Sequence, residues 1–221
     1  MINDVEVKMI SEGHKTTKRI GTDVVASPEI SVVIPAYKVA EFITETLESC
    51  LAQTFGDREV IVVNDGSPDS EQLETAIAPF LERIVYINQT NTGVGEARNT
   101  AIEHSRGEFI AFLDGDDLWH PEFLASQLEF LTSGGYGMVY CNAELFGLPS
   151  VVGTTFMDQA PSNGAANVEA LLDLRCNVIT SGTFARKSVI EAAGMFESGR
   201  EPSEDFHLWV RIAHSGSTIG Y

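Results

Sequence analysis

Apolar residues in the first half of this chain gather in short runs with few polar interruptions, and these runs alternate with longer amphipathic segments. The apolar runs lie at residues 30–34, 59–63, 84–87 and 109–113. Nearly continuous apolar runs of this length are typical of strands buried on both faces of a sheet. Apolar residues recur at helical spacing between them, at residues 41–53, 70–81 and 96–104. This alternation of strand and helix predicts an α/β fold with a central, mostly parallel sheet and helices on both faces.

The second half of the chain is less regular. We predict helices at residues 121–131, 168–174, 188–193 and 205–215, and strands at residues 137–141, 183–185 and 218–221. Between them, residues 145–167 are rich in Gly, Ser, Pro and Thr, so we expect a long loop of the kind that is often functional. Pro35 should end the first strand, because proline lacks the backbone N–H that a sheet uses.

The domain organisation follows from the same pattern. Residues 1–28 are mixed polar and charged without a sustained period, which predicts a flexible N-terminal tail. Residues 29–221 have the length and apolar content of one sizeable α/β domain. No apolar run approaches the roughly 18 residues of a membrane span. The N-terminus also lacks the apolar core of a signal peptide, so we expect a cytoplasmic protein.

Charge and cysteine content exclude several classes of partner. The formal net charge of −18 argues against nucleic acid or an anionic membrane as a partner, since phosphates would be repelled. A bound nucleotide would therefore need a divalent cation and local Arg, Lys or backbone N–H groups. The three cysteines are far apart and form no CxxC pair, which indicates reduced thiols and no zinc site.

Three carboxylates follow the fourth predicted strand, at Asp114, Asp116 and Asp117. The carboxyl ends of strands are where ligands bind in open α/β sheets. An Asp-x-Asp pair places two carboxylates on one side of an extended backbone, where both can reach one hard cation. The alternative is a polar turn in which Asp116 or Asp117 caps the next helix, which Pro121 would begin.

Asp65 ends the second predicted strand and begins the stretch Asp-Gly-Ser-Pro-Asp. This composition is ordinary turn chemistry, which is the simpler interpretation. Because Asp65 and Asp114 end strands of one sheet, a second interpretation is that Asp65 accepts a hydrogen bond from a bound base or ribose.

Gly93, Gly95 and Arg98 partly match the glycine pattern of dinucleotide-binding proteins. Arg98 replaces the third glycine, and no ribose-binding acid follows at the required distance, so we reject a dehydrogenase. Arg98 at the start of a helix can instead neutralise a phosphate, or form a surface ion pair.

Glu204 and Asp205 precede the last predicted helix. They could cap it, with the helix dipole favouring their charge, or supply a general base near the ligand edge of the sheet. His207 has no histidine partner at ligand spacing, so it is expected to be a surface or supporting residue and no metal ligand.

Taken together, these segments resemble the family-2 inverting glycosyltransferases of the nucleotide-diphospho-sugar transferase superfamily, which have a Rossmann-like GT-A fold. The resemblance runs from about Ile30 to Tyr221. The elements that carry it are Val33-Ile34-Pro35-Ala36-Tyr37, Val62-Val63-Asn64-Asp65-Gly66-Ser67-Pro68-Asp69, Asn91-Thr92-Gly93, Ala97-Arg98-Asn99, Phe112-Leu113-Asp114-Gly115-Asp116-Asp117, and Glu204-Asp205 followed by Leu208-Trp209 and Arg211. Their order and spacing are more specific than any single motif.

The resemblance implies a role for each matching residue. Pro35, Ala36 and Tyr37 would line the nucleotide pocket, Asp65 would recognise the base, and Asp114 would face the ribose or donor sugar. Asp116, with Asp114, would hold a Mn²⁺ or Mg²⁺ ion on the diphosphate, and Asp205 would be the general base. The implied reaction moves a sugar from a nucleotide-diphosphate sugar, with the family's preference for UDP-sugars, to a saccharide or other hydroxyl acceptor. Such reactions serve cell-surface polysaccharide or glycoconjugate synthesis.

The chain also departs from the family pattern. It stops inside an expected strand, so we expect residues 29–221 to be a catalytic domain cut short at its C-terminal end, with contact to the inner membrane surface left to a partner or a missing region. A non-catalytic or truncated module that binds nucleotide sugar is the alternative function. A Gln-x-x-Arg-Trp motif is absent, which disfavours a processive synthase. The segment after the first strand lacks the Gly-rich, basic sequence of a pyrophosphorylase.

Overall fold

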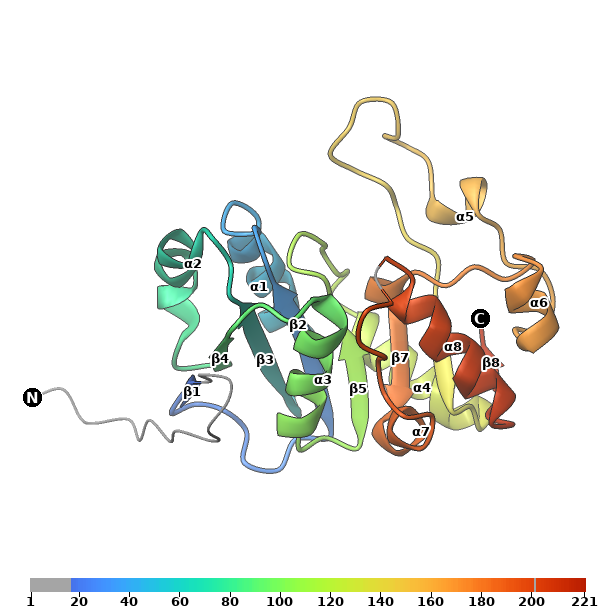
Figure 1. The fold of residues 1–221 in the computed structure, drawn as a ribbon, viewed down its shortest axis with the longest axis horizontal. Helices are drawn as coiled ribbons and strands as arrows, with labels where there is room; N and C mark the ends of the chain where they lie inside the picture. The colour runs from blue at the N-terminus through green and yellow to red at the C-terminus, as the bar shows by residue number, and fades with distance from the viewer. Residues whose placement is uncertain (1–16, 201) are drawn as a thin grey trace, which may run out of the picture.

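The computed structural model describes residues 17–200 and 202–221, in which an eight-stranded sheet has helices on both faces (Figure 1). The strands are β1 (Thr17–Ile20), β2 (Ile30–Ala36), β3 (Arg58–Asp65), β4 (Val85–Gln89), β5 (Phe109–Phe112), β6 (Met138–Tyr140), β7 (Thr183–Arg186) and β8 (Ile219–Gly220). The helices are α1 (Ile43–Leu51), α2 (Ser70–Ile77), α3 (Val94–His104), α4 (Phe123–Gly134), α5 (Phe156–Gln159), α6 (Val168–Leu172), α7 (Lys187–Ala192) and α8 (Glu204–His214), with 3₁₀ turns η1 (Ala78–Phe80) and η2 (Thr180–Gly182).

The strand order across the sheet is β1-β4-β3-β2-β5-β7-β6-β8. Strands β4, β3, β2 and β5 run parallel to one another. Strand β7 runs antiparallel to both β5 and β6, β8 runs parallel to β6, and β1 runs antiparallel to β4. The predicted α/β fold with a mostly parallel central sheet is therefore confirmed. The hydrophobic pattern did not indicate that β7 runs antiparallel to its neighbours.

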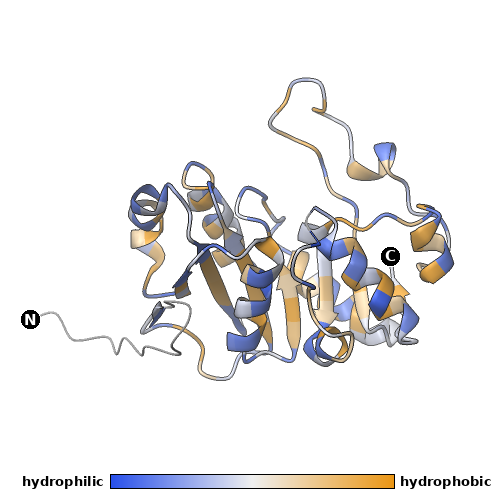
Figure 2. Ribbon diagram, in the orientation of Figure 1, coloured by the Kyte–Doolittle hydropathy of each residue, from blue (hydrophilic) through white to orange (hydrophobic). Residues whose placement is uncertain are grey.

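Side chains of the central strands alternate between two buried layers, one on each face of the sheet. One layer contains Val33 and Ile61 and packs against α3, α6, α7 and α8. The other contains Val32 and Val62 and packs against α1, α2 and α4. Figure 2 shows the apolar strands at the centre, between helices that carry hydrophilic residues. Burial on both faces explains why the sequences of these strands are nearly continuous apolar runs.

The prediction that Pro35 ends the first strand is wrong, because β2 continues through it to Ala36. The carbonyl oxygen of Val33 accepts a hydrogen bond from the backbone N–H of Leu113 at 3.1 Å, on the side of β5. By the alternation of a strand, Pro35 faces the same side two residues later, where β5 has already ended. The missing N–H of Pro35 therefore falls where the pairing with β5 stops, and the strand keeps its pairing with β3.

Strand β1 lies within the predicted N-terminal tail, so this part of the prediction is wrong. Residues 17–20 pair antiparallel with β4, although their sequence is polar and their side chains are mostly exposed. Residues 1–16, which belong to the same predicted tail, lie outside the described residues. The segment after β1 is attached to the body by Arg106, whose guanidinium donates to the carbonyl oxygens of Val25 and Ala26.

Arg106 also pairs with a buried carboxylate at the amino edge of the sheet. The Glu59 carboxylate accepts from the Arg106 side chain at 2.6 Å, from the Arg106 backbone N–H at 2.6 Å and from Ser31 Oγ at 2.7 Å. This network joins β2, β3 and the turn before β5, which fixes the register of three neighbouring strands at one end.

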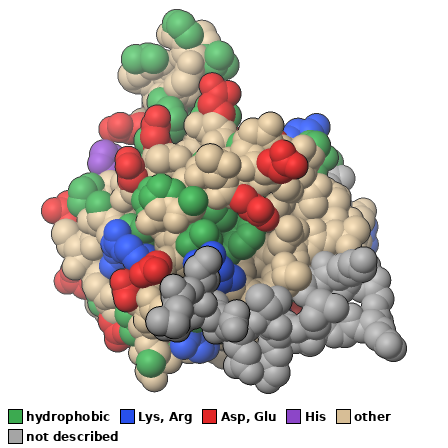
Figure 3. Space-filling model, turned by 90° about the vertical axis from the view of Figure 1, so that its left-hand side faces the viewer, with side chains coloured by type: hydrophobic (Ala, Val, Ile, Leu, Met, Phe, Trp, Pro, Cys, Tyr) green, Lys and Arg blue, Asp and Glu red, His purple; other side chains and the backbone are tan. Residues whose placement is uncertain are grey.

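A long segment, which we call the β6–β7 excursion, connects β6 to β7 through residues 141–182. As predicted, residues 145–167 are mostly irregular, with α5 as a single short helix that Thr155 and Asp158 cap reciprocally. The excursion rises above the body of the molecule in Figure 1, and Figure 3 shows apolar side chains on the part that stands clear. Phe146, Leu148 and Val152 are exposed there.

Within the described residues, none of the helices has the length and apolar character needed to cross a bilayer.

Candidate active site

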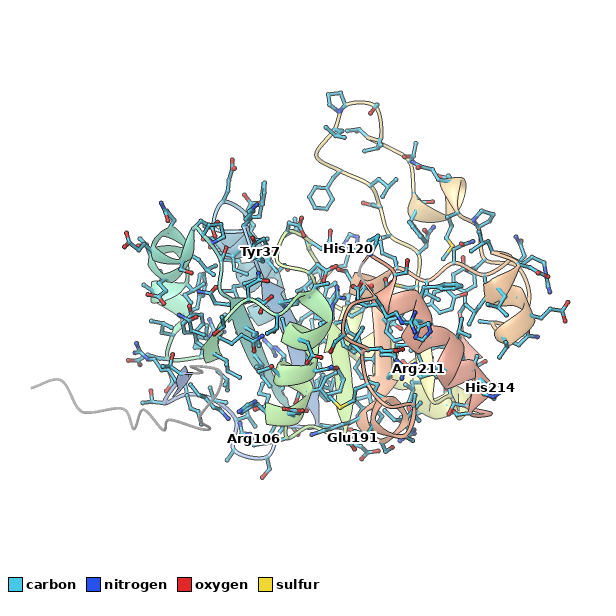
Figure 4. The ribbon with its side chains drawn as sticks, viewed as in Figure 1. Tyr37, Arg106, His120, Glu191, Arg211 and His214 are labelled. Carbon is cyan, nitrogen blue, oxygen red and sulfur yellow. The ribbon has the colours of Figure 1, made fainter. Side chains whose placement is uncertain are left out.

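A cleft of about 440 Å³ opens at the carboxyl edge of the parallel strands. Figure 4 shows Tyr37 and His120 at this edge, whereas Arg106 and Glu191 lie at the opposite one. The cleft is lined by Pro35, Ala36, Tyr37, Val39, Asp65, Asn91, Gly93, Val94, Ala97, Arg98, Asp114, Gly115 and Asp116. All the residues that we predicted for the nucleotide and the cation are among them. Asp205, the predicted general base, is not a lining residue of this cleft.

Asp65 is buried at the end of β3, where it organises one wall of the cleft. Its Oδ1 accepts from Gln89 Nε2 at 2.8 Å and from the backbone N–H of Thr92 at 3.0 Å. Its Oδ2 accepts from the backbone N–H of Gly93 at 2.9 Å. The carboxylate thus holds the loop that leads into α3, and base recognition by Asp65 stays a prediction.

The acidic loop after β5 depends on close backbone approach. A Cβ on Gly115 would lie 2.9 Å from Val39 Cγ2 and 3.2 Å from the carbonyl oxygen of Pro35, so a larger residue would push the loop out of the cleft. The carbonyl oxygen of Gly115 accepts from Thr46 Oγ1 at 3.0 Å. Asp114 and Asp116, on either side of this glycine, both reach the cleft.

The helix-cap interpretation of Asp116 and Asp117 is wrong. Helix α4 begins at Phe123, its N-cap is Glu122, and neither aspartate reaches it. Asp117 instead accepts a hydrogen bond from Ser181 Oγ at 2.5 Å. Burial raises the pKa of the Asp117 carboxyl, and although the Ser181 hydroxyl opposes this rise, the charges of Asp114 and Asp116 add to it.

The residues present fit a divalent cation that is shared with a ligand. Among residues 17–200 and 202–221, no group of three or more His, Cys, Asp and Glu side chains is arranged around one point. Asp114 and Asp116 supply two carboxylates at the cleft. Mg²⁺ is usually held in this way, by one or two carboxylates together with substrate phosphates, so a complete protein cage is not required.

Arg98 is buried in the wall of the cleft between two carboxylates. Its Nη2 donates to Asp114 Oδ1 and its Nη1 to Glu204 Oε1, each at 2.7 Å. Burial alone would lower the pKa of the guanidinium, but Asp114 and Glu204 outweigh burial and raise it. The interpretation of Arg98 as a surface ion pair is therefore wrong, because the pair is buried. Its contact with a phosphate stays a prediction.

Asp205 lies in the first turn of α8, beside the Glu204 that Arg98 binds. Its Oδ2 accepts from Thr180 Oγ1 at 2.7 Å. The N-cap of α8 is Ser203, so the prediction that Asp205 caps the helix is wrong, although both acids are placed well for the helix dipole. His207 lies at the surface as expected, with Nδ1 3.1 Å from Glu197 Oε2.

Thr180 and Ser181 are the residues of this site that the sequence did not identify. Ser181 Oγ accepts from the backbone N–H of Asp114 at 3.0 Å, in addition to donating to Asp117. Both residues precede β7, and a parallel β7 would have placed them at the opposite edge of the sheet. Since β7 is antiparallel to β5, its first residues lie beside the last residues of β5.

A family model described as glycosyl transferase family 2 matches residues 31–191. The chain belongs to glycosyl transferase family 2. The predicted family and enzyme class are thereby confirmed. An uncharacterized glycosyltransferase of Rickettsia typhi is 31% identical to this family-2 chain over 195 residues, which cover 86% of the chain. The chain spans 60% of the length of that relative.

Two solved structures share the fold of this family-2 chain. S. aureus TarS 1–349 in complex with UDP-GlcNAc gives a TM-score of 0.66 at 22% identity, and the match covers 87% of this chain and 56% of that one. The mannosyltransferase PcManGT from Pyrobaculum calidifontis, in complex with GDP-Man and Mn²⁺, gives 0.68 at 22% identity, with 90% and 56% covered. The predicted GT-A type of α/β fold is confirmed.

Proposed function

We propose that this chain carries the catalytic core of a divalent-cation-dependent, inverting glycosyltransferase. It would move a sugar from a UDP-sugar to a hydroxyl group of a saccharide or glycoconjugate acceptor, in the synthesis of cell-surface polysaccharide. One observation carries the proposal: Asp65, Asp114 and Asp116 line a single cleft, and the Arg98–Glu204 pair joins that cleft to the helix that carries Asp205.

The donor is proposed to lie over the ends of β2, β3 and β5. The backbone of Pro35 and Ala36 and the half-exposed ring of Tyr37 form one side of the cleft, and the loop held by Asp65 forms the other. A UDP-sugar is favoured by the motif resemblance and agrees with the UDP-GlcNAc held by the S. aureus relative in fold. The GDP-Man held by PcManGT makes the guanosine donor the first alternative to test.

The cation is proposed to bind Asp116 and the free side of Asp114. When bound, Mn²⁺ or Mg²⁺ would neutralise the diphosphate and stabilise the charge that grows on it as it leaves. PcManGT was solved with Mn²⁺. In a chain of net charge −18, the two carboxylates would otherwise repel a diphosphate, so donor binding and cation binding are expected to depend on each other.

Asp205 is proposed as the general base. As the acceptor oxygen forms its bond to the anomeric carbon, the carboxylate takes the proton of the acceptor hydroxyl, while the bond from that carbon to the diphosphate oxygen breaks. A single displacement inverts the anomeric centre, whereas retention by double displacement would need a nucleophile close to this carbon. Thr180 and the first turn of α8 hold the base at one place, so its proton transfer requires no rearrangement of the helix.

The test is Asp205→Asn, which keeps the size of the side chain and can still accept from Thr180. Because the carboxylate acts only as the acceptor attacks, UDP affinity should hold while the transfer rate falls by roughly 10²–10⁴-fold. Glu191→Gln, which changes an exposed carboxylate of α7 at the opposite edge, serves as the control. An Asp205→Asn variant that transfers sugar as fast as the parent would refute the assignment.

The parent chain must be assayed first, beside a longer form of the protein, since it spans 60% of its Rickettsia typhi relative. A parent that binds UDP with Mn²⁺ but transfers no sugar to any acceptor would support the alternative, a nucleotide-sugar-binding module.

A further inference from the structure

The turn η2 connects the two halves of the site through two neighbouring hydroxyl groups. Thr180 Oγ1 donates to Asp205 Oδ2 at 2.7 Å. Ser181 Oγ accepts from the Asp114 backbone N–H at 3.0 Å and donates to Asp117 Oδ2 at 2.5 Å. Both residues are buried. Adjacent side chains thus contact the proposed base on one side and the proposed cation loop on the other.

The turn itself is held from several directions, so its hydroxyl groups have fixed positions. Trp119 Nε1 donates to the carbonyl oxygen of Ser181 at 2.7 Å, and the backbone N–H of Cys141 donates to the carbonyl oxygen of Gly182 at 3.2 Å. Thr183 Oγ1 donates to the carbonyl oxygen of Ile179 at 3.0 Å, which closes the turn on itself. The next residues enter β7, which is paired on both sides.

Each hydroxyl group holds one part of the proposed site in the orientation that the reaction needs. Asp205 Oδ1 accepts from the Phe206 backbone N–H at 2.6 Å, and the donor fixed on Oδ2 completes the orientation of the carboxylate plane toward the acceptor. The loop from Asp114 to Asp117 contains a glycine and follows the end of β5, so its backbone direction depends on contacts such as the one from Ser181. Because the two contacts come from consecutive residues, the distance between base and cation loop is set by one rigid turn.

We propose that Thr180 and Ser181 are positioning residues of the transfer reaction. Thr180 orients the Asp205 carboxylate toward the acceptor hydroxyl, and Ser181 holds the backbone of Asp114 at the cation edge of the donor cleft. This inference rests on the proposed function and predicts that the two residues affect different kinetic constants.

Thr180→Val keeps the shape of the side chain and removes the hydroxyl group. It should lower kcat by about 10–100-fold, the effect of one hydrogen bond to a charged group, with UDP affinity unchanged. Thr180→Ser restores the donor and should bring kcat back to within about 3-fold of the parent. Ser181→Ala should instead raise the donor KM and weaken UDP binding in the presence of Mn²⁺ by about 10-fold in calorimetry, as expected for a residue behind a cation ligand.

Thr183→Val is the matched control. It also removes a hydroxyl group at this turn, but that hydroxyl group donates to a backbone carbonyl oxygen and to no carboxylate. If Thr180 has a merely structural role, Thr180→Val and Thr183→Val should lower the melting temperature by similar amounts and have the same kcat. Equal kcat values for these two variants, or a Thr180→Ser variant as slow as Thr180→Val, overturn the Thr180 role. Unchanged UDP affinity in Ser181→Ala overturns the Ser181 role.

The outcomes also separate this inference from the proposed function. If Asp205→Asn loses transfer while Thr180→Val keeps it, the function stands and the positioning role of Thr180 is overturned. If the parent transfers no sugar, the proposed function and the Thr180 role fall together, and the calorimetric comparison of Ser181→Ala with the parent decides the Ser181 role by itself.

Discussion

Replacing Arg98 by methionine should destabilise the protein more than the same replacement of Arg106, which pairs with the buried Glu59 at the opposite edge of the sheet. The Arg98 side chain is 5% exposed, and Glu204, which it binds at 2.7 Å, is 7% exposed. Within the described residues, no other donor contacts the Glu204 carboxylate. Arg98→Met therefore leaves a buried, ionised carboxylate without a partner. Asp114 also loses a contact, but its side chain is 33% exposed and water can replace the guanidinium there.

Removing one partner of a buried ion pair costs about 3–5 kcal/mol, chiefly the penalty of the charge left behind. Arg106→Met at the opposite edge is the matched comparison. Glu59 is fully buried, yet after that substitution it still accepts from Ser31 Oγ and from the backbone N–H of residue 106. Its carboxylate stays hydrogen-bonded, so we expect a loss of about 1.5–3 kcal/mol, the value of a hydrogen bond to a charged group.

Urea unfolding of the parent and the two variants measures both values. In a domain of this size each kcal/mol corresponds to about 2–4 °C, so Arg98→Met should lower the melting temperature by about 6–20 °C. Adding Glu204→Leu to Arg98→Met should recover most of that loss, since no charge then stays buried. A cost below about 1 kcal/mol for Arg98→Met, or a larger cost for Arg106→Met, would show that the Glu204 charge is solvated or neutral and refute the reasoning.

Two further predictions concern ligands. UDP should bind far more tightly with Mn²⁺ than without it in calorimetry, and Asp116→Ala should remove most of that difference; equal affinities in the two titrations would count against a cation site. Residues 145–167 have few buried apolar side chains, so their backbone amides should exchange quickly and gain protection when UDP and Mn²⁺ are added. Unchanged hydrogen exchange would identify them as an ordinary surface loop.

The parallel half of the sheet and its ligand edge could be predicted from the sequence for a simple physical reason. Strands buried on both faces appear as apolar runs, and a helix between two successive strands of one sheet makes those strands parallel. Polar residues that end such strands must then meet at one edge. Asp65, Asp114 and Asp116 were expected together on this ground, and they line one cleft.

The antiparallel part of the site could not be predicted in the same way. Strand β7 has four residues and follows an irregular segment, so no handedness rule fixes its direction. The hydroxyl groups of Thr180 and Ser181 were missed for this reason. The pairing of Arg98 with Glu204 joins residues 106 positions apart, and local pattern carries no signal for such a contact. Strand β1 was missed because its exposed, polar residues resemble a tail.

The β6–β7 excursion begins and ends on neighbouring strands, and the hydrogen bond from the Cys141 N–H to the Gly182 carbonyl joins its two ends. The residues that line the donor cleft lie outside the excursion, although Thr180 and Ser181 at its end hold Asp205 and Asp114 in place. Closing a longer excursion is inexpensive, since doubling its length costs only about 0.6 kcal/mol of chain entropy. The exposed outer part of the excursion is therefore exchangeable: grafting a segment of different length and sequence between residues 145 and 154, whose backbones are joined by a hydrogen bond, should leave nucleotide binding intact. In this fold, nucleotide recognition and the length of the exposed loop can be varied separately, one by point substitution in the cleft and the other by replacement of a whole segment.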